Sequence, residues 1–188
     1  MTATIKTFEM SDVHEVKKFT DDQVGRDYFS IQELTLMQKR SVKNGENSSF
    51  VLIDNYQVKG LRLTFPHGNW MSGKGDRLSD HLWDYPIEKT AYFQSLYIHQ
   101  DYQKQGWGKK LSVKAIDTLI AVGSKGVVCH SWMESPNGSS GKYLESLGFK
   151  SIAIYKNYWK NVDYTCPRCG KPCLCTAEEM YLNLENRP

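Results

Sequence analysis

The segment LYIHQDYQKQGWGKK, residues 96–110, decides the fold of this protein. The apolar run that ends at Ile98 predicts a β-strand, and residues 100–108 have the polar and glycine-rich composition of a turn. From Lys109 to Val122 the apolar positions recur at helical spacing. The segment therefore predicts a strand, a turn with two glycines and an amphipathic helix in direct succession.

The turn predicts a binding site for an anion. Gly106 and Gly108 stand directly before the helix, and Lys104, Lys109 and Lys110 add positive charge. The first N–H groups of a helix have no intrahelical partner, and with the helix dipole they attract anions. Glycines lack the Cβ atoms that would keep a pyrophosphate group away from these N–H groups. Taken alone, the two glycines are equally compatible with a simple tight turn.

Hydrophobic periodicity predicts the other elements of the chain. Strands are expected at 4–8, 49–54, 57–65, 90–99, 127–133 and 149–159, and helices after Ser11, at 30–43 and from 139 to Leu147. The expected order is β-α-α-β-β-β-α-β-α-β, with 149–159 as the last strand. Residues 66–89 have no clean period, so we interpret them as a long loop or an irregular insertion.

Two sequence signatures resemble those of one enzyme family. Gln103, Gly106 and Gly108 are similar to the Q/R-x-x-G-x-G/A motif of the GNAT family of N-acetyltransferases. The family's second signature is an Asn, a Tyr six residues later and a Gly-Phe pair, which here are Asn137, Tyr143 and Gly148-Phe149, with Gly141 where Ala is usual. The resemblance covers roughly residues 4 to 159.

The resemblance implies a fold and a coenzyme site. The fold would be α/β (α+β), the GNAT-type acyl-CoA N-acyltransferase fold, with a mixed central sheet, two splayed strands and flanking helices. Acetyl-CoA would bind in the gap between the splayed strands. The implied coenzyme-binding residues are Leu96, Tyr97 and Ile98 for the pantetheine arm, Gln103, Lys104, Gln105, Gly106, Trp107, Gly108 and Lys109 for the pyrophosphate, and Asn137 for the arm or a structural water.

The implied reaction is direct attack of an amine on the thioester of acetyl-CoA in a ternary complex. Tyr143 can act as the general acid that protonates the leaving thiolate, because the pKa of tyrosine, about 10, is close to that of a thiol, about 8.5. The backbone N–H of Ile98 would polarise the carbonyl group. Core packing is the other interpretation of Tyr143, which shares a helix face with Leu144 and Leu147. No general base is singled out among the candidates Glu33, His81, Glu88 and His99.

The insertion at 66–89 carries residues suited to an acceptor pocket. Its aromatic candidates are Trp70, His81, Trp83 and Tyr85, and its acidic candidates, which would attract a cationic amine, are Asp76, Asp80, Asp84 and Glu88. An exposed hairpin or a mobile loop is the alternative.

Four of the five cysteines lie within ten residues of one another. Cys166-Pro167-Arg168-Cys169 is typical of a zinc knuckle, and Cys173 and Cys175 supply two further thiolates. Four sulfurs suit a closed tetrahedral structural zinc site, although the three-residue gap between the pairs is short. Free thiols or a disulfide are the alternatives. Cys129 lies in an apolar stretch and is expected in the core.

Composition limits the class of protein. The 188 residues are 40% hydrophobic and carry a net charge of +3, so we expect one GNAT domain at 1–160 and a cysteine-rich tail at 161–188. Neither nucleic-acid binding, a membrane span nor a secretion signal is expected, and the cytoplasm is the expected location. The acceptor, a small-molecule or peptide amine, is not identified, and a homodimer stays open. Two rival functions are a non-catalytic acyl-CoA-binding module and a zinc module for interactions.

Overall fold

A seven-stranded sheet organises the computed structural model, which describes residues 3–70 and 77–186. In spatial order its strands are β1 (Thr4–Thr7), β4 (Phe50–Asp54), β5 (Gln57–Phe65), β6 (Thr90–Ile98), β7 (Gly126–Trp132), β9 (Ala177–Asn183) and β8 (Lys150–Tyr155). All neighbouring strands are antiparallel except β6 and β7, which are parallel. The expected mixed sheet is therefore confirmed.

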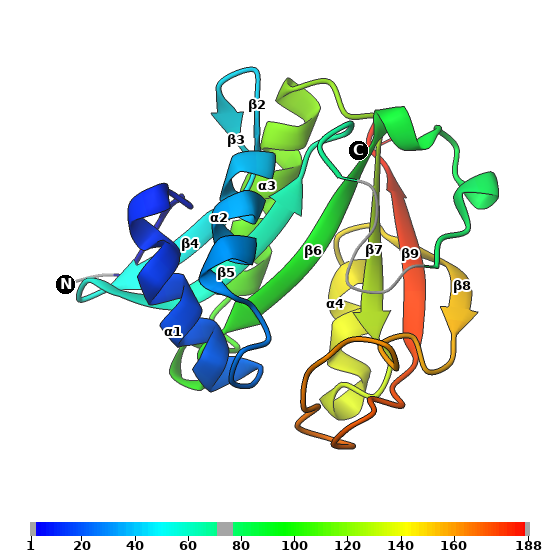
Figure 1. Ribbon diagram of the computed structural model, residues 1–188. Helices are drawn as coiled ribbons and strands as arrows, with labels where there is room; N and C mark the ends of the chain where they lie inside the picture. Colours follow the sequence, from blue (N-terminus) through cyan, green and yellow to red (C-terminus); the bar gives the residue numbers. More distant parts are fainter. Residues whose placement is uncertain (1–2, 71–76, 187–188) are drawn as a thin grey trace.

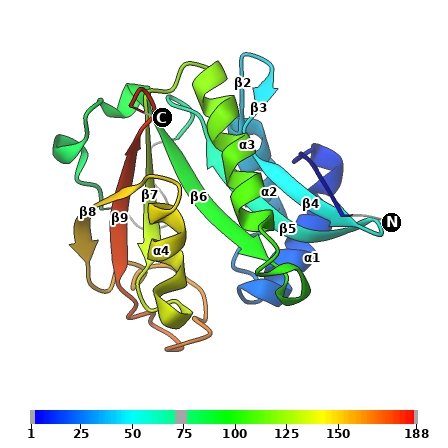
Figure 2. The same cartoon turned by 180° about the vertical axis from the view of Figure 1, so that it is seen from behind.

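Helices cover both faces of this sheet (Figure 1 and Figure 2). The helices are α1 (Val13–Gln23), α2 (Ile31–Arg40), α3 (Trp107–Ala121) and α4 (Ser139–Glu145). Helices α1 and α2 lie on one face, and α3 and α4 lie on the other. Short elements complete the fold: η1 (Met10–Asp12), η2 (Asp80–Leu82), η3 (Ile87–Lys89), η4 (Gln100–Tyr102), η5 (Pro136–Gly138) and the hairpin of β2 (Val42–Lys43) and β3 (Glu46–Asn47). No described helix is both long and apolar enough to cross a membrane.

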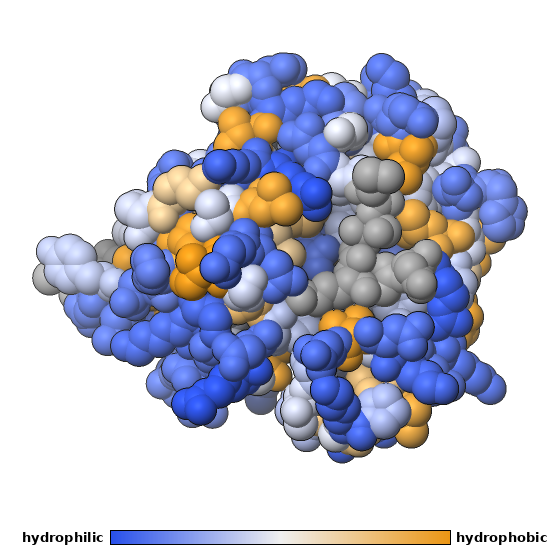
Figure 3. Space-filling view, viewed as in Figure 1, coloured by the Kyte–Doolittle hydropathy of each residue, from blue (hydrophilic) through white to orange (hydrophobic). Residues whose placement is uncertain are grey.

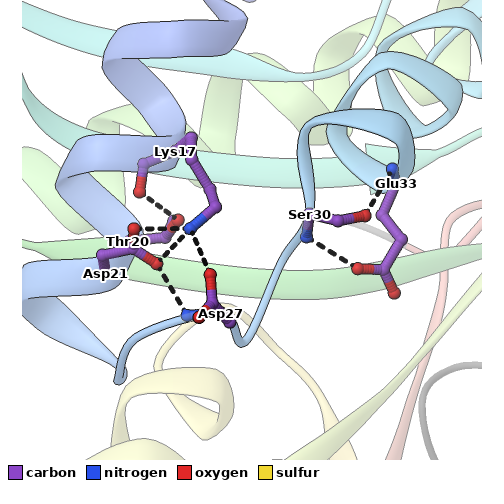
Figure 4. Close-up of polar contacts among 6 residues, drawn as sticks. All are labelled: Lys17, Thr20, Asp21, Asp27, Ser30 and Glu33. Carbon is purple, nitrogen blue, oxygen red and sulfur yellow. Dashed lines mark hydrogen bonds and ion pairs between the residues drawn. The ribbon is translucent and has the colours of Figure 1, made fainter.

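The connection between α1 and α2 is held by polar contacts (Figure 4). The side chain of Ser30 accepts a hydrogen bond from Glu33 N, and the Glu33 carboxylate accepts one from Ser30 N, so a capping box fixes the start of α2. Lys17 lies 2.6 Å from the Asp21 carboxylate and 3.2 Å from Asp27, which joins the end of α1 to this connection.

Strands β6 and β7 pair over only part of their length. Thr90–Phe93 is in register with Gly126–Cys129, and Phe93–Cys129 is the last pair. Beyond it, among the described residues, β6 pairs only with β5 and β7 only with β9, so the two strands diverge (Figure 1). The register with β5 also shifts beside Gln94, which bends β6 at this point. The expected pair of splayed strands is thus present.

Strand β9 corrects the sequence analysis, because 149–159 is not the last strand. Residues 177–183 form β9, which pairs with β7 on one side and β8 on the other. Its sequence, AEEMYLN, contains two adjacent glutamates, which do not indicate a buried strand. Glu179 is nevertheless fully buried, because its carboxylate accepts hydrogen bonds from Ser79 N and Trp83 Nε1. Residues expected in the tail therefore contribute a strand to the interior of the sheet.

The described parts of the insertion, residues 66–70 and 77–89, pack on the face of β6, β7 and β9 opposite α4. The ring of Trp70 stacks on Tyr92 at 4.8 Å, and the ring of Trp83 stacks on Tyr181 at 6.0 Å. Both tryptophans are buried in this cluster, so they are core residues. His81 is exposed, and Asp76 lies outside the described residues. Apolar residues on the face of Figure 1 form separate groups among hydrophilic ones (Figure 3).

Candidate functional site

The first turn of α3 has the geometry of an anion site. Gly106 is the N-cap with a φ of 81°, a left-handed conformation that favours glycine. Its carbonyl oxygen accepts the hydrogen bond from Lys110 N at 3.0 Å, so the N–H groups between these residues lie in the open first turn. A Cβ atom at Gly108 would lie 3.3 Å from the Leu96 side chain. The two glycines are thus needed for different reasons, one for backbone conformation and one for the close approach of α3 to β6.

Side chains of the loop before α3 stabilise the loop itself. Gln103 Nε2 donates a hydrogen bond of 2.9 Å to the carbonyl of Ile98, and Gln105 Nε2 donates one of 2.7 Å to Asp101. Lys104 is exposed with a φ of 60°, and Lys109 is also exposed. Gln103 and Gln105 therefore shape the loop, while the two lysines offer charge to a ligand in solvent.

The end of β6 faces the gap left by β7. Leu96 and Ile98 pack toward α3, whereas Tyr97 packs in the cluster beneath α1 and α2. On its other side this part of β6 pairs with β5, Leu96 with Arg62 and Ile98 with Gly60. Within the described chain, the β7-facing edge of residues 94–98 has no strand beside it, so its backbone is available to a ligand.

Tyr143, from the second signature, contacts Gly108, from the first signature. From α4 its hydroxyl donates a hydrogen bond of 3.0 Å to the carbonyl of Gly108 and lies 2.5 Å from Ser112 Oγ. Burial raises the pKa of Tyr143, and the Arg62 charge and the Ser112 hydrogen bond oppose that rise. The hydroxyl therefore stays protonated at neutral pH, as a general acid requires.

Asn137 lies in the turn before α4. It is exposed, its φ is 57°, and its carbonyl accepts a hydrogen bond of 3.0 Å from Lys142 Nζ. Asparagine tolerates this left-handed conformation better than most residues. The position of Asn137 thus has a conformational reason in addition to the coenzyme contact that the resemblance implies.

The four clustered cysteines converge on one point. Their Sγ atoms all lie within 4.8 Å of one another. The Sγ–Sγ distances are 3.7 Å for Cys169–Cys175, 3.8 Å for Cys166–Cys175 and 3.9 Å for Cys169–Cys173. A tetrahedral zinc with Zn–S bonds of about 2.3 Å separates its sulfurs by about 3.8 Å. The cluster therefore has the dimensions of a tetrathiolate zinc site.

The electrostatics of the cluster also suit a cation. Burial raises the pKa of Cys173, and burial together with the neighbouring thiols raises the pKa of Cys175 to about 12. Burial acts in the same sense on Cys166, but hydrogen bonds from the Cys169 and Arg168 backbones outweigh it and lower its pKa to about 6. Four thiolates in one place repel each other, and a divalent cation bound among them offsets this electrostatic repulsion.

The cysteine loop touches the opposite half of the molecule. Its thiols pack against Trp132, Trp159 and Tyr164. The Tyr164 ring lies 4.9 Å from the ring of Tyr28, which belongs to the connection between α1 and α2. The loop between β8 and β9 therefore meets the α1–α2 connection.

Comparison with known proteins identifies the family. The model of the Acetyltransferase (GNAT) family matches residues 26–149. The protein belongs to the GNAT family. Comparison with curated protein sequences finds no significant match.

Solved structures share the GNAT fold at low sequence identity. Ribosomal-protein-S18-alanine N-acetyltransferase from Escherichia coli is 20% identical, with a TM-score of 0.66 over 100% of this chain and 99% of that one. A chain of the NatC complex solved with Gag peptide and CoA is 18% identical, with a TM-score of 0.68 over 97% and 99%. The yncA protein from Salmonella typhimurium, solved with acetyl-CoA, is 17% identical, with a TM-score of 0.61 over 100% and 97%.

The GNAT reaction requires loss of a proton from the amine, and the structure describes the surroundings of each candidate base. Glu33 forms the capping box of α2. His81 and Glu88 are exposed on η2 and η3, and His99 Nδ1 accepts a hydrogen bond from Asp101 N. None of these contacts points to a base, so the residue stays unassigned.

Sequence reasoning missed two buried polar groups near the divergence of β6 and β7. On the α1–α2 face, His130 Nε2 lies 3.5 Å from the Glu179 carboxylate, and His130 Nδ1 lies 3.2 Å from the Tyr92 hydroxyl. On the α3 face, Arg62 is 3% exposed, and its guanidinium carbon lies 3.5 Å from the ring centre of Phe93. Both lie in apolar strand sequences, where no local pattern marks a functional residue.

Proposed function

We propose that this GNAT protein transfers the acetyl group of acetyl-CoA to an amine by direct attack in a ternary complex. The observation that supports this most is the hydrogen bond between Tyr143 and the Gly108 carbonyl, which brings the candidate acid to the candidate anion site. The open first turn of α3 would bind the pyrophosphate, and the unpaired edge of residues 96–98 would pair with the pantetheine arm.

The reaction follows from this arrangement. The amine nitrogen attacks the thioester carbonyl carbon, and the backbone N–H of Ile98 donates to the developing oxyanion. The C–S bond then breaks, and its electron pair leaves with the sulfur. Tyr143 gives its proton to that sulfur, and the nitrogen loses its proton to water or a base. The products are an N-acetylated amine and CoA.

Titration calorimetry with acetyl-CoA, followed by a free-thiol assay on a panel of amines, tests the proposal. The panel includes polyamines, small amines and peptides with free α-amines, because two structural relatives are described with protein or peptide substrates. Heat of binding with thiol release on at least one amine is the expected result. Binding without turnover would instead favour a regulatory module, and absence of binding would refute the proposal.

We also propose that Cys166, Cys169, Cys173 and Cys175 bind one structural Zn²⁺. The sulfur–sulfur distances of 3.7–3.9 Å support this assignment. The ion would neutralise the clustered thiolates and hold the loop between β8 and β9, with no part in acyl transfer. A reducing compartment such as the cytoplasm keeps the thiols available for metal, so we propose that location. Elemental analysis of the purified protein should find zinc equimolar with the chain.

A further inference from the structure

Arg62 carries a buried charge that no carboxylate in the described part of the chain neutralises. It lies in the middle of β5, and its side chain is 3% exposed. Its Nε and Nη2 atoms are buried and lack a hydrogen-bond partner among the described residues. Its stack on Phe93, with 3.5 Å from the guanidinium carbon to the ring centre, offers only the face of an aromatic ring. A buried guanidinium without an anion is costly, so a partner with negative charge must explain its presence.

The guanidinium lies at the point where the coenzyme site begins. Leu61 and Leu63 pack under α1 and α2, so Arg62 between them faces α3. Phe93, beneath the guanidinium, forms with Cys129 the last pair before β6 and β7 diverge. The charge is therefore held at the closed end of the gap, on the side of α3 and α4.

Three titratable groups surround this charge, and the proposed reaction makes only one of them negative. Burial lowers the pKa of Arg62 to about 10, and the charges of Tyr143, Cys129 and Tyr92 act against that decrease. Burial raises the pKa of all three groups, so all three are neutral before the reaction. Tyr143 is the group that loses a proton in the proposed reaction.

We propose that Arg62 is a positioning residue that stabilises the negative charge shared by the coenzyme sulfur and the Tyr143 oxygen as the C–S bond breaks. The electron pair of that bond moves to sulfur, and the Tyr143 proton follows it. One net negative charge thus stays on this pair until a proton returns from solvent. A fixed cation in a dry site lowers the energy of that state without reorganisation. The inference rests on the proposed acetyl transfer.

The test compares two coenzyme forms that differ only at sulfur. CoA carries a thiol that can ionise, and desulfo-CoA carries none. If Arg62 favours ionisation of the sulfur–Tyr143 pair, this pair in the complex loses a proton at a lower pH than the thiol of free CoA does. The affinity for CoA then rises as the pH passes the pKa of the bound pair, and it levels off above the pKa of the free CoA thiol, about 8.5. The affinity for desulfo-CoA does not change over this range.

The variants are Arg62→Met, Arg62→Lys and the exposed control Arg40→Met. We expect Arg62→Met to bind acetyl-CoA and desulfo-CoA as the wild type does. Its CoA preference, which is the ratio of the affinities for CoA and desulfo-CoA, should fall about tenfold or more at high pH, because a shift of one pKa unit changes this ratio tenfold. Its kcat should fall while the KM for acetyl-CoA is unchanged. Arg62→Lys should restore part of the pH-dependent preference, and Arg40→Met should leave it intact.

An unchanged ratio of CoA to desulfo-CoA affinity in Arg62→Met at every pH would overturn the inference. If Arg62→Met does not fold, the Arg62→Lys variant provides the test. In that variant, pH profiles of CoA preference and of kcat that match those of the wild type would also overturn the inference. Wild-type protein that binds neither coenzyme refutes the proposed function, and the inference with it. Wild-type binding with an unaltered Arg62→Met ratio refutes the inference alone.

Discussion

The Tyr143 hydroxyl lies 3.0 Å from the carbonyl oxygen of Gly108, a residue 35 positions earlier in the chain. This hydrogen bond joins the first turn of α3 to α4. The carbonyl belongs to the same turn whose N–H groups are open to an anion. The acid and the proposed phosphate site are therefore fixed relative to each other before any coenzyme binds.

Replacing Tyr143 with Phe should lower kcat by about 10²–10⁴, the usual contribution of a general acid. The KM for acetyl-CoA should change little, because the ring stays in place. Burial raises the pKa of Tyr143, so in the wild type the acid should be lost only as pH rises above the ordinary tyrosine value of about 10. Steady-state kinetics against pH measures both effects. Ser112→Ala, which keeps the phenol, is the control, and full activity of Tyr143→Phe at all pH values would contradict the assignment.

Replacing Gly108 with Ala should weaken acetyl-CoA binding by roughly tenfold, or ~1.4 kcal/mol. The added Cβ would lie 3.3 Å from the Leu96 side chain, so either this side chain or the first turn of α3 must shift by a small amount. Calorimetry measures the affinity. Gly141→Ala is a matched control, since its Cβ would be crowded to the same degree, 3.3 Å from Glu178 Oε2, but it lies on α4 and not in the first turn of α3. That control should keep full affinity. Equal affinity in both variants would argue against close packing as the role of Gly108.

Loss of a cysteine ligand should remove zinc and destabilise the protein. Cys169→Ser and Cys173→Ser should each lose the metal and about 2 kcal/mol or more, which is roughly 4–8 °C in Tm for a chain of this size. Metal analysis and thermal melts with and without a chelator provide the measurement. Cys129→Ala, outside the cluster, should keep its zinc. Retention of equimolar zinc by both ligand variants would exclude the four-cysteine site.

Glu179 should contribute stability that depends on pH. Burial alone would raise its pKa, but the nearby His130 ring and the hydrogen bonds from Trp83 and the Ser79 backbone together lower it. A lowered folded-state pKa means that the contribution is complete above the unfolded value of about 4.3 and is lost as pH falls through the folded value. Glu179→Gln should therefore cost roughly 3 kcal/mol at neutral pH and less in acid. Urea unfolding at several pH values measures this, with the neighbouring Glu178→Gln as control. A difference that does not shrink in acid would disprove this account.

The sequence predicts those features that are local in the chain. The start of α2 follows from Ser30 and Glu33, which lie three residues apart, and the turn before α3 follows from Gly106 and Gly108. The two family signatures are local as well, and each fixes its own element. The family and the mixed sheet were therefore within reach of the sequence.

Features that depend on distant partners were not predictable. Strand β9 is stable with a glutamate inside it because Ser79 and Trp83, about a hundred residues away, donate to Glu179. Arg62 lies between two leucines of β5, and only the packed sheet shows that its charge lies on Phe93. In both cases the residue is explained by a contact with a residue that is distant in the chain, and a single sequence does not show such contacts.

The position of β9 has a consequence for synthesis on the ribosome. Until residues 177–183 have emerged, the edge of β7 that pairs with β9 has no neighbour, and β8 has no place in the sheet. Unpaired edges of this kind recruit other nascent chains. We therefore expect polypeptides stalled before residue 177 to aggregate. Early capture of zinc by the cysteines, which precede β9, would draw the β8–β9 hairpin together and shorten the period of exposure.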